Sequence, residues 1–267
     1  MRPLLAGTLQ QRRRSIIWWS VGVSAFILLT LIFYPTIHSQ SDQLNKSLGH
    51  LSQTTKQLFT DTGDLFSPLG YLSSQLFYLM LPLLLSVLAI SLGTSLIGRE
   101  ERDSTIELLL SRPVSRTRYL LAKAAAGTLI VAAVGLISTI VTIIICKAVD
   151  LEVPAPDILA AGAAVILLSL SLGALAFFVA ALGRAGRSAS IGIASVYGLG
   201  GYIIYSLSQS IDWLKGPAKL FPFSYYHASE LLTGSYNWLN ALFFVALALF
   251  FTLLAWLVFR RRDLLGS

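Results

Sequence analysis

Residues 98–118 read GREERDSTIELLLSRPVSRTR and form a charged island between two long apolar runs. Nine of these residues are ionisable, whereas the apolar runs on either side contain no acidic residue. A protein that keeps such a segment between membrane-spanning helices must hold it in water. Charge runs are usually solvated loops, but this one also carries Ile106 and Leu108 to Leu110, which need an apolar partner. We therefore interpret the island as a surface that faces a soluble protein.

The island also carries the signals that begin and end a short helix. Ser104 and Glu107 fit a capping box, in which each side chain accepts a hydrogen bond from the backbone N–H of the other residue. Pro113 disfavours helical backbone at Arg112, so we expect the helix to end just before that residue. The pattern predicts about two helical turns over residues 104–111, with an apolar face made by Ile106, Leu109 and Leu110.

The composition is that of an integral membrane protein. The chain has 267 residues, of which 55% are hydrophobic and 12% charged, and its mean hydropathy is +0.72. About a quarter of the residues of a soluble domain are charged. The only cysteine, Cys146, excludes an internal disulfide and a zinc site built from cysteines. We expect an all-α, polytopic membrane protein made of a single transmembrane domain.

Six apolar runs are long enough to cross a bilayer. The first has nineteen residues, which as a helix span about 28 Å, the thickness of the hydrocarbon core. It is too long for a signal peptide, and no A-x-A-like cleavage site follows it. Pro82 is expected to kink the second span, and Ser115 to cap the third. The predicted spans are 16–34, 69–97, 119–146, 158–182, 188–208 and 239–259.

The basic residues predict the orientation. All fourteen arginines fall in four places: residues 1–15, the island, the turn 183–187 and the run 260–262. With Lys123, these places hold fifteen basic residues, against five lysines in the alternating segments. The positive-inside rule then places both termini and the island in the cytoplasm. The net charge of +7 thus indicates topology rather than nucleic-acid binding, and we expect a multi-pass protein of a prokaryotic inner or plasma membrane.

Two longer segments, 35–68 and 209–238, are expected outside the membrane on the other side. Leucines in the first recur at helical spacing and predict an amphipathic surface helix. The second is rich in tyrosine, tryptophan and phenylalanine, which favour either an interfacial belt or a shallow re-entrant hairpin with a short helix over residues 228–232. Glycine and alanine are abundant in spans four and five, which predicts close helix packing but is equally consistent with a moving interface.

Motifs for chemistry are missing from the sequence. The chain contains no G-x-x-x-x-G-K-[ST], H-E-x-x-H, C-x-x-C or G-x-S-x-G, and its three histidines are isolated in predicted loops. No ionisable residue lies in the middle of a span, which argues against a transporter with its own ion-coupling site. We expect no catalytic, metal or cofactor site in this chain. The uncharged spans favour an amphiphilic or apolar cargo over an ion.

The island resembles the cytoplasmic segment of the ABC-2 type permeases, the membrane subunits of ABC exporters. That family carries E-E-x-x-G-T-x-E-x-L-L-x-x-P-V-S-R after its second span and a lysine early in the third. Ser104 stands where the family often has glycine, and serine caps a helix at least as well. The six-span layout and the long segment before the last span agree more loosely. The matching residues are Glu100, Glu101, Thr105, Glu107, Leu109, Leu110, Pro113, Val114, Ser115, Arg116 and Lys123.

The resemblance implies a permease subunit that pairs with a second copy or a sister chain and with two separate P-loop ATPase subunits. These ATPases would bind ATP and magnesium, and the island helix would be a coupling helix seated in an ATPase groove. Residues 1–15 would form a connecting helix along the inner membrane surface, and Arg184 and Arg187 a second cytoplasmic contact. The alternative function is a membrane anchor or assembly factor without transport. The implied coupling residues are Glu100, Glu101, Ser104, Thr105, Ile106, Glu107, Leu109, Leu110, Arg112, Pro113 and Arg116.

Overall fold

The computed structural model describes residues 2–38, 67–102, 115–183 and 187–261. Every regular element in these ranges is helical, which confirms the predicted all-α class. The leucine pattern of segment 35–68 falls on residues 39–66, outside the described ranges. The elements are α1 (Arg2–Ile32), α2 (Tyr34–His38), α5 (Pro68–Leu72), the π-helix η1 (Ser73–Phe77), α6 (Met80–Arg102), α8 (Arg116–Ala148), α9 (Ala155–Ala181), α10 (Arg187–Ser208), η2 (Asp212–Leu214), α11 (Lys215–Ala218), η3 (Pro222–Tyr225), α12 (Ala228–Leu232), η4 (Trp238–Asn240) and α13 (Ala241–Arg261).

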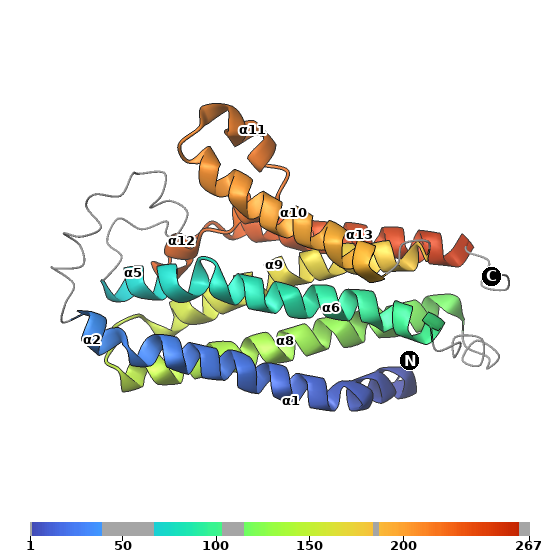
Figure 1. Ribbon diagram of the computed structural model, residues 1–267, viewed down its shortest axis with the longest axis horizontal. Helices are drawn as coiled ribbons and strands as arrows, with labels where there is room; N and C mark the ends of the chain where they lie inside the picture. The colour runs from blue at the N-terminus through green and yellow to red at the C-terminus, as the bar shows by residue number, and fades with distance from the viewer. Residues whose placement is uncertain (1, 39–66, 103–114, 184–186, 262–267) are drawn as a thin grey trace.

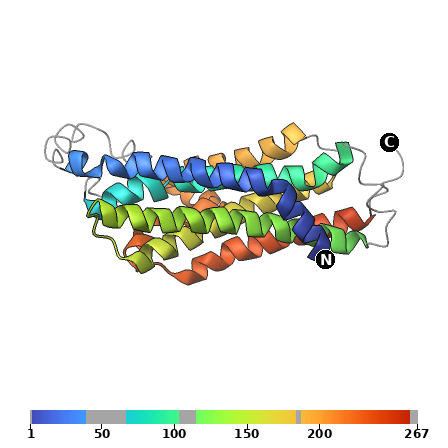
Figure 2. The same cartoon turned by 90° about the horizontal axis from the view of Figure 1, so that it is seen from below.

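Six helical stretches in the described ranges are long and apolar enough to cross a membrane, as the sequence predicted. They are Leu4–Ile37, Pro68–Ile97, Arg116–Ala148, Ala155–Ala181, Arg187–Ser208 and Trp238–Arg261. The predicted connecting segment 1–15 and the first predicted span are parts of one helix, because α1 runs without a break from Arg2. Its first turns bend away from the axis of the rest of the helix (Figure 2).

The second span is interrupted close to its proline. Pro82 has no N–H to donate to the carbonyl of Tyr78, and its ring crowds that preceding turn. The chain forms a π-helical turn, η1, just before α6 begins, so the expected break lies about one turn ahead of the proline. The carbonyl oxygen of Phe77 at the end of η1 accepts a hydrogen bond of 2.7 Å from the hydroxyl of Tyr226.

Helix α9 lies in the middle of the bundle and contacts α6, α8, α10 and α13. Its closest neighbour is α6, because two glycines face each other where the two helices meet. A Cβ at Gly93 of α6 would overlap the carbonyl oxygen of Gly173 and lie 3.0 Å from the amide nitrogen of Phe177. Small residues permit this approach of backbones. The glycines of α10 differ: a Cβ at Gly192 or Gly200 would meet nothing within 4 Å, so these two do not serve packing within the chain.

The arrangement of the helix ends positions the candidate site. The beginning of α1, the end of α6, the beginnings of α8 and α10 and the end of α13 lie at one end of the bundle (Figure 1). We call this the arginine end, since the described residues of all four arginine places lie there. Helices α2, α5 and α12 lie toward the opposite, distal end (Figure 1). The six spans thus bring the described residues of all four arginine places to the same end of the bundle, as the sequence predicted. That this end faces the cytoplasm stays a prediction.

Candidate functional site

The predicted coupling residues lie at the arginine end, on and between α6 and α8. Glu100 and Glu101 lie in the last turns of α6, and Arg116 is the first residue of α8. Arg187 is the first residue of α10. The structure thus brings the two flanks of the island to the same end as α10. The following members of the predicted set lie outside the described residues: Ser104, Thr105, Ile106, Glu107, Leu109, Leu110, Arg112, Pro113 and Arg184.

The beginning of α8 is fixed in place by its cap and by α13. The hydroxyl of Ser115 accepts a hydrogen bond of 3.3 Å from the N–H of Arg118, which confirms the predicted N-cap. Two residues after Ser115, Oγ1 of Thr117 accepts a hydrogen bond of 3.1 Å from Nε1 of Trp256. The rings of Tyr119 and Phe259 stack with their centroids 6.0 Å apart, and both side chains are fully buried. The exit of the island therefore cannot shift without moving the last turns of α13.

Two cations at this end rest on aromatic rings. The ammonium group of Lys123 lies 5.6 Å from the centroid of the Tyr119 ring, and the side chain is only 5% exposed. The guanidinium of Arg260 lies 4.7 Å from the centroid of the Trp256 ring. Attraction to the ring face offsets part of the cost of removing a cation from water. Lys123 is thus part of the packed base of the bundle rather than a solvated loop residue.

The entrance to the island is tied to α1. The guanidinium of Arg12 donates to Oγ of Ser95 at 2.9 Å and to its carbonyl oxygen at 3.3 Å, near the end of α6. The sequence did not predict this contact, nor the bond between Thr117 and Trp256, because both join helices far apart in the chain. The one available signal was the row of Trp256 and Arg260, four residues apart near the end of the last span.

Most of the described basic residues gather at one end of the bundle. The described cationic side chains at the arginine end belong to Arg12, Arg13, Arg14, Arg116, Arg118, Lys123, Arg187, Arg260 and Arg261. Glu100 and Glu101 of α6 belong to the same end. The other acidic residues of the described ranges lie in the connection from α8 to α9, the first turn of α9 and residues 209–238: Asp150, Glu152, Asp157, Asp212 and Glu230. Basic residues therefore outnumber acidic ones in the described part of the arginine end.

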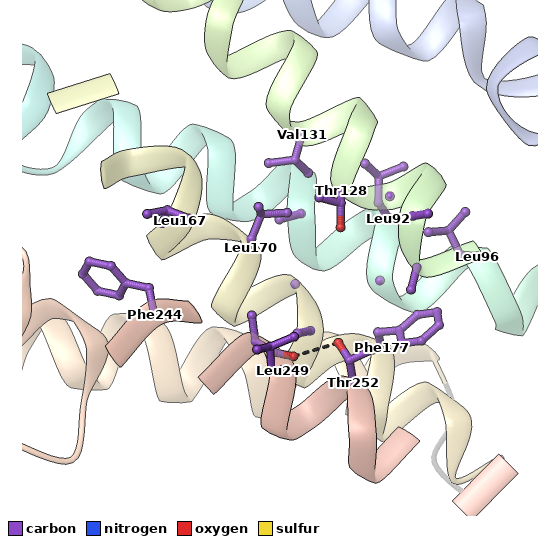
Figure 3. A pocket seen from close by; sticks show the side chains of 18 of the residues that line it. Leu92, Leu96, Thr128, Val131, Leu167, Leu170, Phe177, Phe244, Leu249 and Thr252 are labelled. Atoms are coloured by element: carbon purple, nitrogen blue, oxygen red, sulfur yellow. Dashed lines mark hydrogen bonds between the residues drawn. The ribbon is translucent and has the colours of Figure 1, made fainter. Parts of the chain in front are cut away.

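An apolar cavity of about 390 Å³ lies between α6, α8, α9 and α13 (Figure 3). Its wall is made by leucine, alanine, valine, glycine and phenylalanine, with the hydroxyls of Thr128 and Thr252 as the polar groups. The hydroxyl of Thr252 already donates a hydrogen bond of 2.7 Å to the carbonyl oxygen of Ala248 (Figure 3). The wall offers no acid, base or nucleophile, so the cavity suits binding of an apolar group rather than catalysis.

The aromatic segment 209–238 folds against the bundle through tyrosine hydroxyls. Tyr226 bonds to Phe77 in η1, and the hydroxyl of Tyr236 donates to the carbonyl oxygen of Tyr225 at 2.7 Å. Burial, with a smaller contribution from Glu230, raises the pKa of Tyr236 to about 12, so its hydroxyl stays a donor at neutral pH. The predicted helix over residues 228–232 is confirmed as α12. This segment is a packed cap with specific hydrogen bonds.

The histidine of this cap does not belong to a metal centre that the structure describes. Nδ1 of His227 lies 3.5 Å from Oε2 of Glu230 and makes no hydrogen bond. No group of three or more histidine, cysteine, aspartate or glutamate side chains that could hold a metal occurs among residues 2–38, 67–102, 115–183 and 187–261.

Comparison with known proteins gives one family. The family model described as ABC-2 family transporter protein matches residues 4–264, nearly the whole chain. A comparison with curated proteins found no match. The match includes the island, all six spans and the cap, and it agrees with the resemblance inferred from the island's residues. The chain therefore belongs to the ABC-2 family of transporter proteins, and it is a multi-pass, helical membrane subunit of an ABC transporter.

Proposed function

We propose that this chain is the permease subunit of an ATP-driven exporter, and that residues 98–118 transmit movement from separate cytoplasmic ATPase subunits. The membership in the ABC-2 family carries this proposal. The fold supports it, because the helices on either side of the island are each anchored to another span: α6 to α1 through Arg12, and α8 to α13 through Trp256. A force applied at the island would reach four of the six spans.

In this mechanism the ATPases bind ATP and magnesium, and this chain supplies the membrane-spanning helices that move around the transport path. The apolar face of Ile106, Leu109 and Leu110 would sit in an ATPase groove, as amphipathic helices do in helix-in-groove complexes. Glu100, Glu101, Glu107, Arg112 and Arg116 would set its direction through ion pairs, each of small individual value at an exposed surface. Closure of the ATPase dimer would then switch the spans between inward- and outward-open states, and the uncharged spans would pass an amphiphilic or apolar cargo outward.

A second permease copy or a sister chain would complete the path. Helix α10 supports this part of the proposal, because it presents an apolar face that none of the helices described in the structure covers. Val196 on this face is 72% exposed, and Gly192 and Gly200 have open space where a side chain would be. Close approach of a second backbone fits such a face.

The test is purification of the chain with its ATPase and measurement of ATP hydrolysis in vesicles. Ile106→Asp should uncouple hydrolysis from transport, because it places a charge on the apolar face of the island helix. Leu108→Asp is the matched control, since in the predicted helix, at 100° per residue, Leu108 would point away from Ile106 and Leu110. Equal effects of the two changes would contradict the coupling role.

The alternative is a membrane anchor or assembly factor without transport. It makes a different prediction: the chain would purify without an associated ATPase, and the Ile106→Asp change would leave hydrolysis in the membrane fraction untouched.

A further inference from the structure

The apolar cavity between α8 and α13 opens on the outer surface of the bundle. On α8, its wall includes Leu121, which is 41% exposed, and on α13 it includes Leu249, which is 65% exposed. Helix α13 packs mainly on α9, and it contacts α8 at the arginine end through Trp256 and Phe259. The two helices therefore flank a crevice that opens sideways toward the bilayer, with their own contacts inside it at the arginine end.

The volume and lining fit a hydrocarbon chain. A cavity of about 390 Å³ lies within the range of small-ligand sites, roughly 300–1,000 Å³. The lining extends along α8 from Leu121 to Val131, a separation of ten positions or about 15 Å of helix. An empty void of this size would forfeit dispersion contacts along its whole wall. Since the crevice opens to the bilayer, a lipid tail is the group at hand to fill it.

The rows of residues that line the crevice lead to a cation on each helix. On α8, Arg118 precedes Leu121 by three residues, so it lies on the same face, one turn closer to the arginine end. On α13, the row continues from Thr252 through Trp256 to Arg260, in steps of four residues. Both arginines are exposed residues, and Arg260 lies over the Trp256 ring. An apolar crevice whose two helices each carry an exposed arginine in the next turns toward the arginine end has the polarity of a phospholipid with an anionic headgroup.

We propose that the crevice between α8 and α13 is a binding site for an anionic phospholipid of the leaflet at the arginine end. One acyl chain lies in the cavity along Leu121, Thr128 and Leu249, and the headgroup phosphate lies between Arg118 and Arg260. The indole of Trp256 lies at the level between chain and headgroup, as interfacial tryptophans do. This site requires neither transport nor an ATPase.

The proposal is tested by quenching of Trp256 with brominated lipid. The full-length protein, with Trp18, Trp19, Trp213 and Trp238 changed to phenylalanine, is placed in phosphatidylcholine nanodiscs. Brominated phosphatidylglycerol and brominated phosphatidylcholine are then titrated in separate samples. Bromine on the acyl chains reports only tryptophan at membrane depth, so a co-purifying soluble ATPase does not interfere. We expect phosphatidylglycerol to quench at a mole fraction about 30-fold lower, the factor for two basic residues that each contribute about 1 kcal/mol.

Variants separate the two parts of the site. Arg118→Gln with Arg260→Gln should remove the preference for the anionic lipid, whereas Arg187→Gln, an exposed arginine at the same end on α10, should keep it. Ala248→Phe should fill the cavity and reduce quenching by both lipids. Equal quenching by the two lipids in the unaltered protein, or a preference that survives the double arginine change, would overturn the proposal and leave only ordinary boundary lipid.

Discussion

The close approach of α6 and α9 makes Gly93→Ala the most informative single change in the fold. The new methyl group would overlap the carbonyl oxygen of Gly173, and it would lie 3.0 Å from the amide nitrogen of Phe177 and 3.2 Å from the Cβ of Ala176. The nearest obstacles are backbone atoms of α9, which cannot turn aside as a side-chain tip can. The two helices must therefore separate.

The free-energy cost of separating α6 and α9 can be measured against a control variant that has the same gain in helix propensity but no steric overlap. Overpacking of a tight interface costs about 1–3 kcal/mol. Alanine in place of glycine gains up to about 1 kcal/mol of helix propensity at either position. Gly22→Ala in α1, where the methyl group meets nothing within 4 Å, receives only the gain. The two variants should therefore differ by about 1–3 kcal/mol in the free energy of unfolding, with Gly93→Ala the less stable.

Cys146 provides the assay. It is the only cysteine of the chain and is 1% exposed, so a thiol-reactive fluorophore reports its release as the detergent-solubilised protein is heated. At about 2–4 °C per kcal/mol, the two variants should melt roughly 2–12 °C apart. If Gly93→Ala and Gly22→Ala melt at the same temperature, then α6 and α9 do not approach each other through Gly93, and the packing of these two helices described above is wrong.

Two further changes test the ends of the bundle. Trp256→Phe should remove the hydrogen bond to Thr117 and lower the free energy of unfolding by about 1 kcal/mol. A double-mutant cycle with Thr117→Val, measured by the same Cys146 assay, should show that the two changes are coupled. Independent effects of the two changes would refute the contact. Tyr226→Phe leaves the carbonyl oxygen of Phe77 without its buried donor, so it should lower the free energy of unfolding by about 1–3 kcal/mol. Tyr225→Phe, which loses an exposed bond to the carbonyl of Lys219, should cost less, and the reverse order of the two melting temperatures would contradict the role of Tyr226 in the cap.

Much of the local structure could be predicted, because it depends on neighbours in the chain. Ser115 caps α8 as expected, since an N-cap needs only a hydroxyl and the next turn of backbone. The helix over residues 228–232 forms as expected between a proline-containing turn and a glycine, Gly234, whose φ of 71° ends it. The break in the second span was expected at Pro82, but the widened turn comes just before α6, because the proline disturbs the turn that precedes it.

Contacts between helices could not be predicted in the same way. Glycine enrichment in spans four and five predicted close packing, yet Gly173 is pressed against α6 while Gly192 and Gly200 face open space. The sequence carries the same signal in all three cases. Which face of a helix meets a neighbour depends on its rotation about its own axis, and that rotation is set by all of its partners together.

The sequence by itself determined the class of protein, the number of spans, their parity and the family, because apolar length, charge asymmetry and the island's residues are properties of the chain in order. Only the tertiary structure decided which residues hold the island's flanks. Arg12 and Ser95 are 83 positions apart and Thr117 and Trp256 are 139 apart, and no periodicity connects such pairs. The same holds for the crevice, since its two rows of wall residues belong to helices that meet only when α9 has brought α13 beside α8.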